Sequence, residues 1–183
     1  MKKNSDKKIL FISGSPRSGN TEYVISRLLD LVKGDNEAIF LREKNIKRCK
    51  GCLACHSQPI CPIKDDDVHQ IMNQVINADI LVVGSPNYFE NVSGLMKDFI
   101  DRLHPLYKNK VIKGKKAVLF MVGGGKALGN SEVAKSSMHG FIKHYELELV
   151  QTFGFQALGL NDLKKDSSNE EIMVKMAQII NEL

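Results

Sequence analysis

Short apolar runs alternate with segments of helical periodicity along the chain, and this alternation restricts the fold more than any other feature. Five runs have the length and composition of buried strands: 9–12, 38–41, 80–83, 117–122 and 147–153. Apolar residues at helical spacing lie between these runs, as in Val24, Leu28 and Val32. Strands that alternate with helices form parallel sheets, because each crossover passes over one face of the sheet. The sequence therefore predicts an α/β fold.

We expect one helix to begin near Asn20 or Thr21 and a second to begin after the acidic capping residues 65–67. Three further helices are expected over the ranges 95–103, 132–145 and 170–182. Right-handed crossovers between five strands give a doubly wound parallel sheet of order 2-1-3-4-5, with helices on both faces. Ligands of such sheets bind at the carboxyl ends of the strands, where the strand order reverses. We expect the site in the loops after the first, third and fourth strands.

Length and charge narrow the protein class. The 183 residues suit one domain over 1–183, since domains contain about 100–200 residues. The formal net charge is +5, and basic residues gather in 1–8, 42–50 and 108–116. The chain has no tryptophan and no nucleic-acid-binding motif, so we expect these stretches to be solvated basic surface and expect no nucleic-acid partner. No run approaches the roughly 20 apolar residues of a membrane span. We expect no membrane association and a cytoplasmic location.

The loop after the first predicted strand, 14–21, has the features of a phosphate site. It precedes a helix, where free N–H groups and the helix dipole favour an anion. Asn20 replaces the lysine of the pattern G-x-x-x-x-G-K-[ST], and Pro16 breaks the dinucleotide pattern G-x-G-x-x-G. We therefore expect a phosphomonoester, with these contacts: Ser15, Arg17, Ser18, Gly19, Asn20 and Thr21. The alternative is a turn that only starts and caps the helix.

Two further loops predict a platform for a flat heterocycle. Segment 86–89 follows the third strand, and segment 123–125 follows the fourth. Aromatic side chains can lie against a ring, and glycines leave room for one beside the backbone. The expected contacts are Pro86, Asn87, Tyr88, Phe89, Gly123, Gly124 and Gly125. The alternatives are that Tyr88 and Phe89 belong to the core and that the glycines form a plain mobile loop.

All cysteines of the chain lie in one short segment: Cys49, Cys52, Cys55 and Cys61. Two consecutive C-x2-C steps, with Pro62 after the last cysteine, are similar to ferredoxin-type ligation of an iron–sulfur cluster. Two alternatives stay open, namely a zinc ion held by four thiolates, and free thiols or local disulfides without metal. His56 and His69 are not included in the ligand set. We name residues 47–64 the cysteine loop.

Taken together, the segments GSPRSGNT at 14–21 and SPNYFENVSGLMKDFIDR at 85–102, with the cysteines between them, resemble the flavodoxin-fold NAD(P)H-dependent FMN reductases. More narrowly, they resemble the iron–sulfur flavoproteins. The resemblance implies a flavodoxin-like fold, with the FMN phosphate on 15–21 and the isoalloxazine ring beside 86–89 and 123–125. It also implies a [4Fe–4S] cluster on the cysteines, and a homodimer or homotetramer with flavin sites near a subunit interface.

FMN exchanges both electron pairs and single electrons, whereas an iron–sulfur cluster exchanges single electrons. We therefore expect an FMN-dependent oxidoreductase that takes electrons from NAD(P)H or a reduced ferredoxin-like donor and passes them to a small-molecule acceptor. No side chain is predicted to be catalytic. The alternatives are a metal-free NAD(P)H-dependent FMN or quinone reductase, a flavodoxin-like electron carrier without turnover of its own, and a zinc-stabilised binding module.

Overall fold

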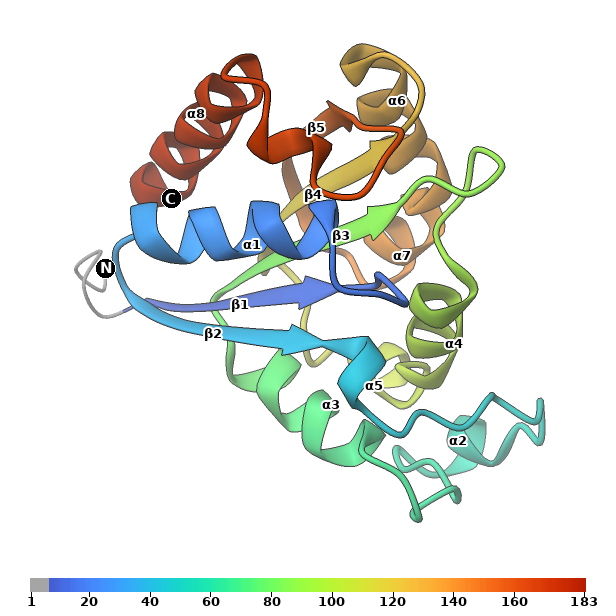
Figure 1. The fold of residues 1–183 in the computed structure, drawn as a ribbon. Coiled ribbons are helices and arrows are strands. Elements are labelled where there is room, and N and C mark those ends of the chain that lie inside the picture. The colour runs from blue at the N-terminus through green and yellow to red at the C-terminus, as the bar shows by residue number, and fades with distance from the viewer. Residues whose placement is uncertain (1–6) are drawn as a thin grey trace.

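A five-stranded parallel sheet forms the centre of the protein in a computed structural model, which describes residues 7–183 (Figure 1). The strand order is β2-β1-β3-β4-β5, which confirms the predicted order. The strands are β1 (Lys8–Ser13), β2 (Asp35–Phe40), β3 (Ile80–Pro86), β4 (Lys116–Gly123) and β5 (Glu148–Gln156). Residues 1–6 of the expected N-terminal basic stretch lie outside the described residues.

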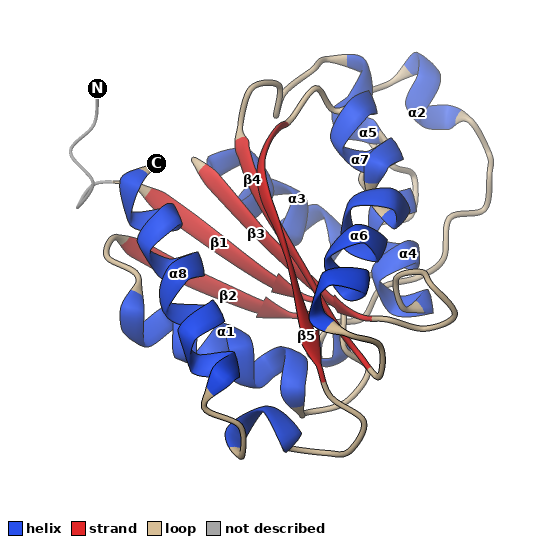
Figure 2. Cartoon of the chain, turned by 90° about the horizontal axis from the view of Figure 1, so that it is seen from above, coloured by secondary structure: helices blue, strands red, loops and turns tan. Residues whose placement is uncertain are grey.

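Helices cover both faces of the sheet (Figure 2). One face carries α1 (Asn20–Leu31) and α8 (Ser168–Glu182). The opposite face carries α3 (Val68–Asn77), α4 (Gly94–Arg102), α5 (Pro105–Lys108), α6 (Ala127–Ser137) and α7 (His139–His144). Alternate residues of β1 point to opposite faces, so that Phe11 belongs to one core and Ile12 to the other. Both cores are therefore built on the same buried strands.

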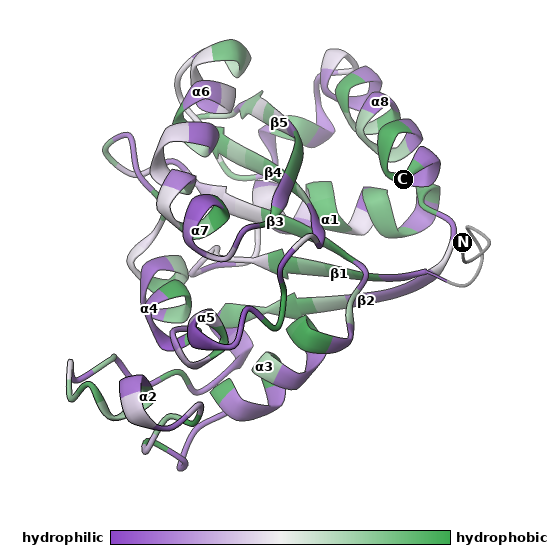
Figure 3. Cartoon of the chain, turned by 180° about the vertical axis from the view of Figure 1, so that it is seen from behind, coloured by the Kyte–Doolittle hydropathy of each residue, from purple (hydrophilic) through white to green (hydrophobic). Residues whose placement is uncertain are grey.

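The short elements of the chain lie in its connections. They are η2 (Leu41–Glu43), α2 (Ala54–Ser57) and η3 (Asp162–Lys164). The cysteine loop, which contains α2, projects from the body of the molecule (Figure 1). In Figure 3, the central strands are mainly hydrophobic, whereas this loop carries hydrophobic and hydrophilic residues side by side. In the described part of the chain, no helix has the length and apolar character that a membrane span requires.

The predicted helix over 132–145 differs from the structure. It begins earlier, at Ala127, and Met138 divides it into α6 and α7. A Cβ atom built at Gly154 would lie 1.8 Å from the carbonyl oxygen of Ala127, so the start of α6 packs directly on the backbone of β5. This contact between distant segments, which local periodicity does not contain, explains the early start.

Of the acidic residues 65–67, which the sequence predicts to cap α3, only Asp66 binds an N–H of the helix, and the N-cap residue Asp67 makes no side-chain cap hydrogen bond. These acids also hold the beginning of the cysteine loop. Asp66 Oδ1 accepts the N–H of Val68 at 3.2 Å. Asp66 Oδ2 accepts the N–H of Lys47 at 3.1 Å, and Asp67 Oδ2 accepts that of Asn45 at 2.7 Å. The start of α3 is therefore attached to the segment that enters the cysteine loop.

Candidate functional site

The loops after β1, β3 and β4 meet at the edge of the sheet where the strand order reverses. With the loop after β5, they line a crevice of ≈ 180 Å³. Most of the predicted phosphate and ring contacts line it: Ser15, Arg17, Gly19, Asn20, Thr21, Pro86, Asn87, Tyr88, Gly123 and Gly124. Ser18, Phe89 and Gly125 are exposed and do not line it. The sheet topology thus brings the three predicted loops together.

The first turn of α1 forms one wall of the crevice. Gly19, the N-cap residue, has no side chain with which to bind the free N–H groups of this turn. Its carbonyl oxygen accepts the N–H of Tyr23 at 2.9 Å, which fixes the start of the helix. Thr21 is buried in the same turn and lines the crevice. An anion here would meet unused backbone N–H groups and the positive end of the helix dipole.

Internal hydrogen bonds hold the loop between β1 and α1. Ser15 Oγ donates to the carbonyl oxygen of Arg17 at 2.6 Å, and Ser93 Oγ donates to that of Gly14 at 2.5 Å. A Cβ at Gly14 would lie 2.7 Å from the Cβ of Met96, so the loop passes over α4 with no room for a side chain. The loop is thereby fixed, while the Arg17 side chain remains exposed beside the crevice.

The side chain of Asn20 connects the phosphate loop to the loop after β5. Its Nδ2 donates to the carbonyl oxygen of Gly159 at 2.8 Å, and its Oδ1 accepts the N–H of Leu163 at 3.3 Å. Both ends of the amide are therefore engaged with protein groups, whereas the sequence predicts this amide as a phosphate contact. Through these bonds Asn20 positions the segment that brings Ala157 and Leu158, which the sequence analysis did not include, into the crevice lining.

A tight turn carries the aromatic residues after β3. Tyr88 and Asn91 exchange backbone hydrogen bonds of 3.0 and 3.1 Å, and the two residues between them, Phe89 and Glu90, have φ of 52° and 57°. Two consecutive positive φ values are the geometry of a type I′ turn. Tyr88 is 45% exposed and Phe89 is 104% exposed, so the alternative that both belong to the core is wrong.

Asn130 connects three segments of the crevice by hydrogen bonds, a role that no sequence motif predicted. Its side chain is 1% exposed. Nδ2 donates to the carbonyl oxygens of Gly125 and Phe155 at 2.8 Å each, and Gly123 O lies 3.1 Å away. Its Oδ1 accepts the Nδ2 hydrogen of Asn87 at 2.9 Å. Asn87 Oδ1 is buried and has no hydrogen-bond partner within residues 7–183, so an acceptor remains unused at the crevice.

The four cysteines line a separate cavity of ≈ 340 Å³. All four are free thiols, of which Cys49 and Cys52 are exposed, Cys55 is half-buried and Cys61 is buried. Burial and the neighbouring thiols raise the pKa of the Cys55 thiol, whose Sγ lies 3.2 Å from Nδ1 of His104. In residues 7–183, no three His, Cys, Asp or Glu side chains are grouped closely enough to hold one metal ion.

Arg102, at the end of α4, holds both ends of the cysteine loop. Its fully buried guanidinium donates from Nη1 to the carbonyl oxygen of Lys47 at 2.5 Å and from Nη2 to that of Ile63 at 3.2 Å. It also pairs with Asp66. Burial opposes ionisation of Asp66, but the hydrogen bonds from Arg102 and from backbone N–H groups outweigh it and keep the pKa of Asp66 below its usual value.

The Nε atom of Arg102 is left without a partner by these contacts. It is buried and makes no hydrogen bond within the described part of the chain. Burial lowers the pKa of Arg102, but the hydrogen bond with Asp66 and the nearby sulfur of Cys61 outweigh it and raise this pKa. Arg102 and Cys61 both line the cysteine cavity. The sequence offers no local signal for this role, because Lys47, Ile63 and Arg102 become neighbours only in the folded chain.

Comparison with known proteins adds a family to this geometry. A family model described as NADPH-dependent FMN reductase matches residues 7–157. The chain belongs to this family. As a member of the FMN reductase family it is an FMN-dependent oxidoreductase, and the resemblance stated from its motifs is confirmed.

Two curated relatives of this FMN reductase family member cover most of its length. An iron–sulfur flavoprotein of Methanocaldococcus jannaschii is 30% identical over 179 residues, which are 93% of this chain and 92% of that protein. An iron–sulfur flavoprotein of Methanosarcina thermophila is 34% identical over 145 residues, which are 74% and 75% of the two chains. These relatives connect the chain to the iron–sulfur flavoproteins within the family.

Solved structures share the fold of this FMN reductase family member. The apo form of an NADH:FMN oxidoreductase has a TM-score of 0.63 at 20% identity, covering 96% of this chain and 88% of that chain. An NAD(P)H:quinone oxidoreductase from Methanothermobacter marburgensis has a TM-score of 0.68 at 16% identity, covering 96% and 94%. At these identities the likeness establishes the flavodoxin-like fold alone.

Proposed function

We propose that this protein is an iron–sulfur flavoprotein that takes electrons from NAD(P)H or a reduced ferredoxin-like donor and passes them to a small acceptor. In this proposal FMN binds in the crevice and the cysteine loop holds a [4Fe–4S] cluster. The observation that carries it is that all four cysteines line one cavity in a chain that belongs to the FMN reductase family. The names of the relatives support the cluster.

The crevice residues fit a flavin with one phosphate. The phosphate would accept hydrogen bonds from the first-turn N–H groups of α1 and from the Thr21 hydroxyl, with Arg17 as an exposed cation beside it. The unpaired Asn87 Oδ1 is an acceptor for an N–H group of the ring. Bound FMN supplies the exchange of electron pairs and single electrons, and these residues bind and orient it.

The crevice is smaller than the roughly 300–1,000 Å³ of typical small-molecule sites, so part of the ring would lie outside it. Tyr88 and Phe89 are exposed next to this position and can cover a ring face. We include in the proposal a homodimer or homotetramer in which a second subunit covers the outer part of the flavin.

The cysteine cavity fits a cluster in its donor set. Four thiols are the ligands that a [4Fe–4S] cluster requires, and all of them reach one hollow. Cys61 is already buried beside Arg102, so one ligand position is preformed, whereas Cys49 and Cys52 are exposed and can close around the cluster. Exposed thiols also suit a reducing compartment, and the cytoplasm belongs to the proposal.

Anaerobic purification, followed by an absorption spectrum and by iron, sulfide, zinc and flavin analysis, tests both cofactors together. We expect one FMN and four irons per chain, and NAD(P)H oxidation when an acceptor is added. Cys52→Ser should lose the iron and keep the flavin, whereas Ser57→Ala, an exposed substitution in the same loop, should keep both. One zinc per chain, or a yellow iron-free protein, would contradict the cluster. A colourless protein that does not bind added FMN would contradict the whole proposal.

A further inference from the structure

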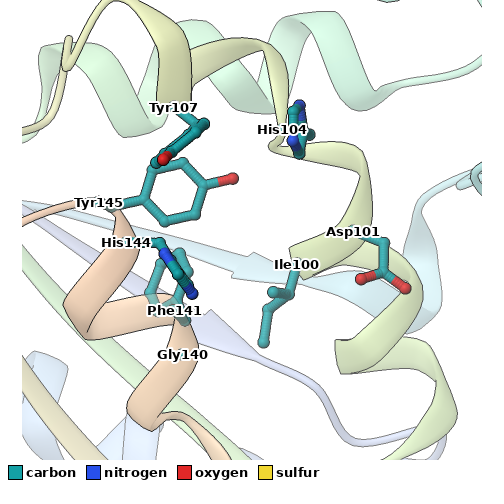
Figure 4. A pocket seen from close by; sticks show the side chains of 8 residues that line it. All are labelled: Ile100, Asp101, His104, Tyr107, Gly140, Phe141, His144 and Tyr145. Atoms are coloured by element: carbon teal, nitrogen blue, oxygen red, sulfur yellow. The ribbon is translucent and has the colours of Figure 1, made fainter. Parts of the chain in front are cut away.

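A third cavity, of ≈ 330 Å³, lies among α4, α5 and α7 and is distinct from the crevice. We propose that it is a second ligand site, which binds a planar aromatic carboxylate. The side chains of Tyr107, Phe141 and Tyr145 and the rings of His104 and His144 line it (Figure 4). Its volume lies within the roughly 300–1,000 Å³ of small-molecule sites and suits a ligand of one or two rings.

The rings of the cavity already form a series of aromatic contacts. His104 and Tyr107 have centroids 5.6 Å apart, Tyr107 and Tyr145 6.2 Å, and Phe141 and Tyr145 5.2 Å. These separations are those of tilted and edge-to-face pairs, which leave ring faces and edges available to a further ring. A flat aromatic ligand would extend this series, whereas an aliphatic ligand would not match its geometry.

The hydroxyl of Tyr145 is a hydrogen-bond donor available to a ligand. Tyr145 is 7% exposed, and its hydroxyl makes no hydrogen bond with any residue in 7–183. Figure 4 shows the hydroxyl pointing into the cavity. Burial, followed by the negative charges of Asp101 and Cys55, raises the pKa of Tyr145, so the hydroxyl keeps its proton and can donate a hydrogen bond. A carboxylate oxygen is the acceptor that would satisfy it best.

Positive charge beside the cavity favours an anionic ligand. A neighbouring hollow shares Tyr107 and His144 with the cavity and is lined by Lys108, Lys110 and Lys143. The one acid there, Glu146, is paired with Lys110 and Lys113. In the wall of the cavity itself, the carboxylate of Asp101 is paired with Lys97 at 2.6 Å. Lys143 makes no ion pair within the described residues.

The cavity also shares a wall with the cysteine cavity. Asp101 and His104 line both, and Nδ1 of His104 lies 3.2 Å from Sγ of Cys55. A bound ligand would therefore lie across the wall that Asp101 and His104 form between the two cavities. The cavity shares no lining residue with the crevice, where FMN is proposed to bind.

Titration of the purified full chain with 2-naphthoate, followed by calorimetry with and without added FMN, tests the site. We expect saturable binding of one naphthoate per chain that FMN does not compete with. The neutral isostere 2-naphthamide should bind at least tenfold more weakly, because the hydrogen bond to a charged acceptor and the attraction to the lysines are lost. The ligand undergoes no redox reaction, so the result does not depend on the proposed cofactors.

Two matched pairs of variants locate the binding. Tyr145→Phe should weaken naphthoate binding about tenfold, whereas Tyr23→Phe on α1 should not change it. Lys143→Gln should weaken binding severalfold and keep the unfolding temperature, whereas the exposed Lys175→Gln should leave binding unchanged. The proposal is overturned by no saturation at millimolar naphthoate, by competition from FMN, or by equal effects within both pairs. It is also overturned if a second copy of the chain covers the cavity, which sedimentation would detect as an oligomer that Tyr107→Ala dissociates.

Discussion

The crevice and the cysteine cavity are built in opposite ways. The crevice is assembled from four loops that the sheet brings to one edge, and the buried Asn130 connects three of them. The cysteine cavity is formed mainly by one continuous projecting loop, whose two ends are held by Arg102 and Asp66. A site distributed over the fold depends on packing, whereas a site within one loop depends on a few anchors. We therefore expect substitutions to affect the two sites separately.

The largest separation should come from Arg102→Met. This change leaves the Asp66 carboxylate buried without its partner, and removing one member of a buried ion pair costs about 3–5 kcal/mol. We expect a lower urea midpoint, loss of iron, and flavin binding that is retained in the folded fraction. Arg48→Met removes an 86% exposed arginine of the same loop and should change neither stability nor iron content. Equal loss of FMN and iron in Arg102→Met would show that the two sites are not separate.

Asn130→Ala should produce the opposite pattern. The change removes the Nδ2 donor that binds the carbonyl oxygens of Gly125 and Phe155 and the Oδ1 acceptor of Asn87, which we expect to cost about 2–4 kcal/mol. FMN affinity should fall while the iron content stays the same. Urea unfolding and flavin fluorescence titration measure the two effects. Asn73→Ala, at an exposed position of α3, is the control for the substitution itself.

Thr21→Val tests the phosphate end of the crevice with little change in volume. Loss of one hydrogen bond to a charged phosphate should weaken FMN binding about tenfold or more and leave the cluster intact. Thr152→Val removes a hydroxyl that contacts Ser131 and should not affect FMN binding. Unchanged affinity in Thr21→Val would place the phosphate elsewhere.

The smallest effect concerns acid stability of the cysteine loop. Because the pKa of Asp66 in the folded chain lies below its ordinary value of about 3.9, its stabilising contribution is present above about pH 4 and is lost as the pH falls through the lower folded value. Thermal unfolding between pH 5 and pH 2.5 should show this loss in the parent chain. Asp66→Asn should start from a lower unfolding temperature and decline less over the same range.

Strand order and the position of the crevice were predictable from the sequence, because buried parallel strands and the reversal of their order determine which loops meet. The same rule placed residues as distant as Thr21 and Gly124 in one lining. The roles of Asn130 and Arg102 were not predictable. Each acts through contacts with backbone oxygens of distant segments, and neither lies in a pattern that differs from an ordinary helix.

The differences in detail have the same origin. The early start of α6 depends on Gly154 of strand β5, which has no Cβ atom at the point where the helix packs on the strand. The exposure of Phe89 depends on the type I′ turn, which two non-glycine residues form against their usual preference. The engagement of Asn20 depends on the path of the loop after β5. Periodicity describes each element alone, whereas these features arise where two elements meet.

A single guanidinium binds the carbonyl oxygens of Lys47 and Ile63, and this gives the segment between them an unusual freedom. Between its ends, the segment also contacts Asp98, His104 and Lys108, which belong to α4, α5 and the connection between them. We expect its length and ligand pattern to change without disturbing the sheet, because these contacts are to helices and not to strands. The position is therefore a natural place to transplant other metal-binding peptides into a flavin-binding framework.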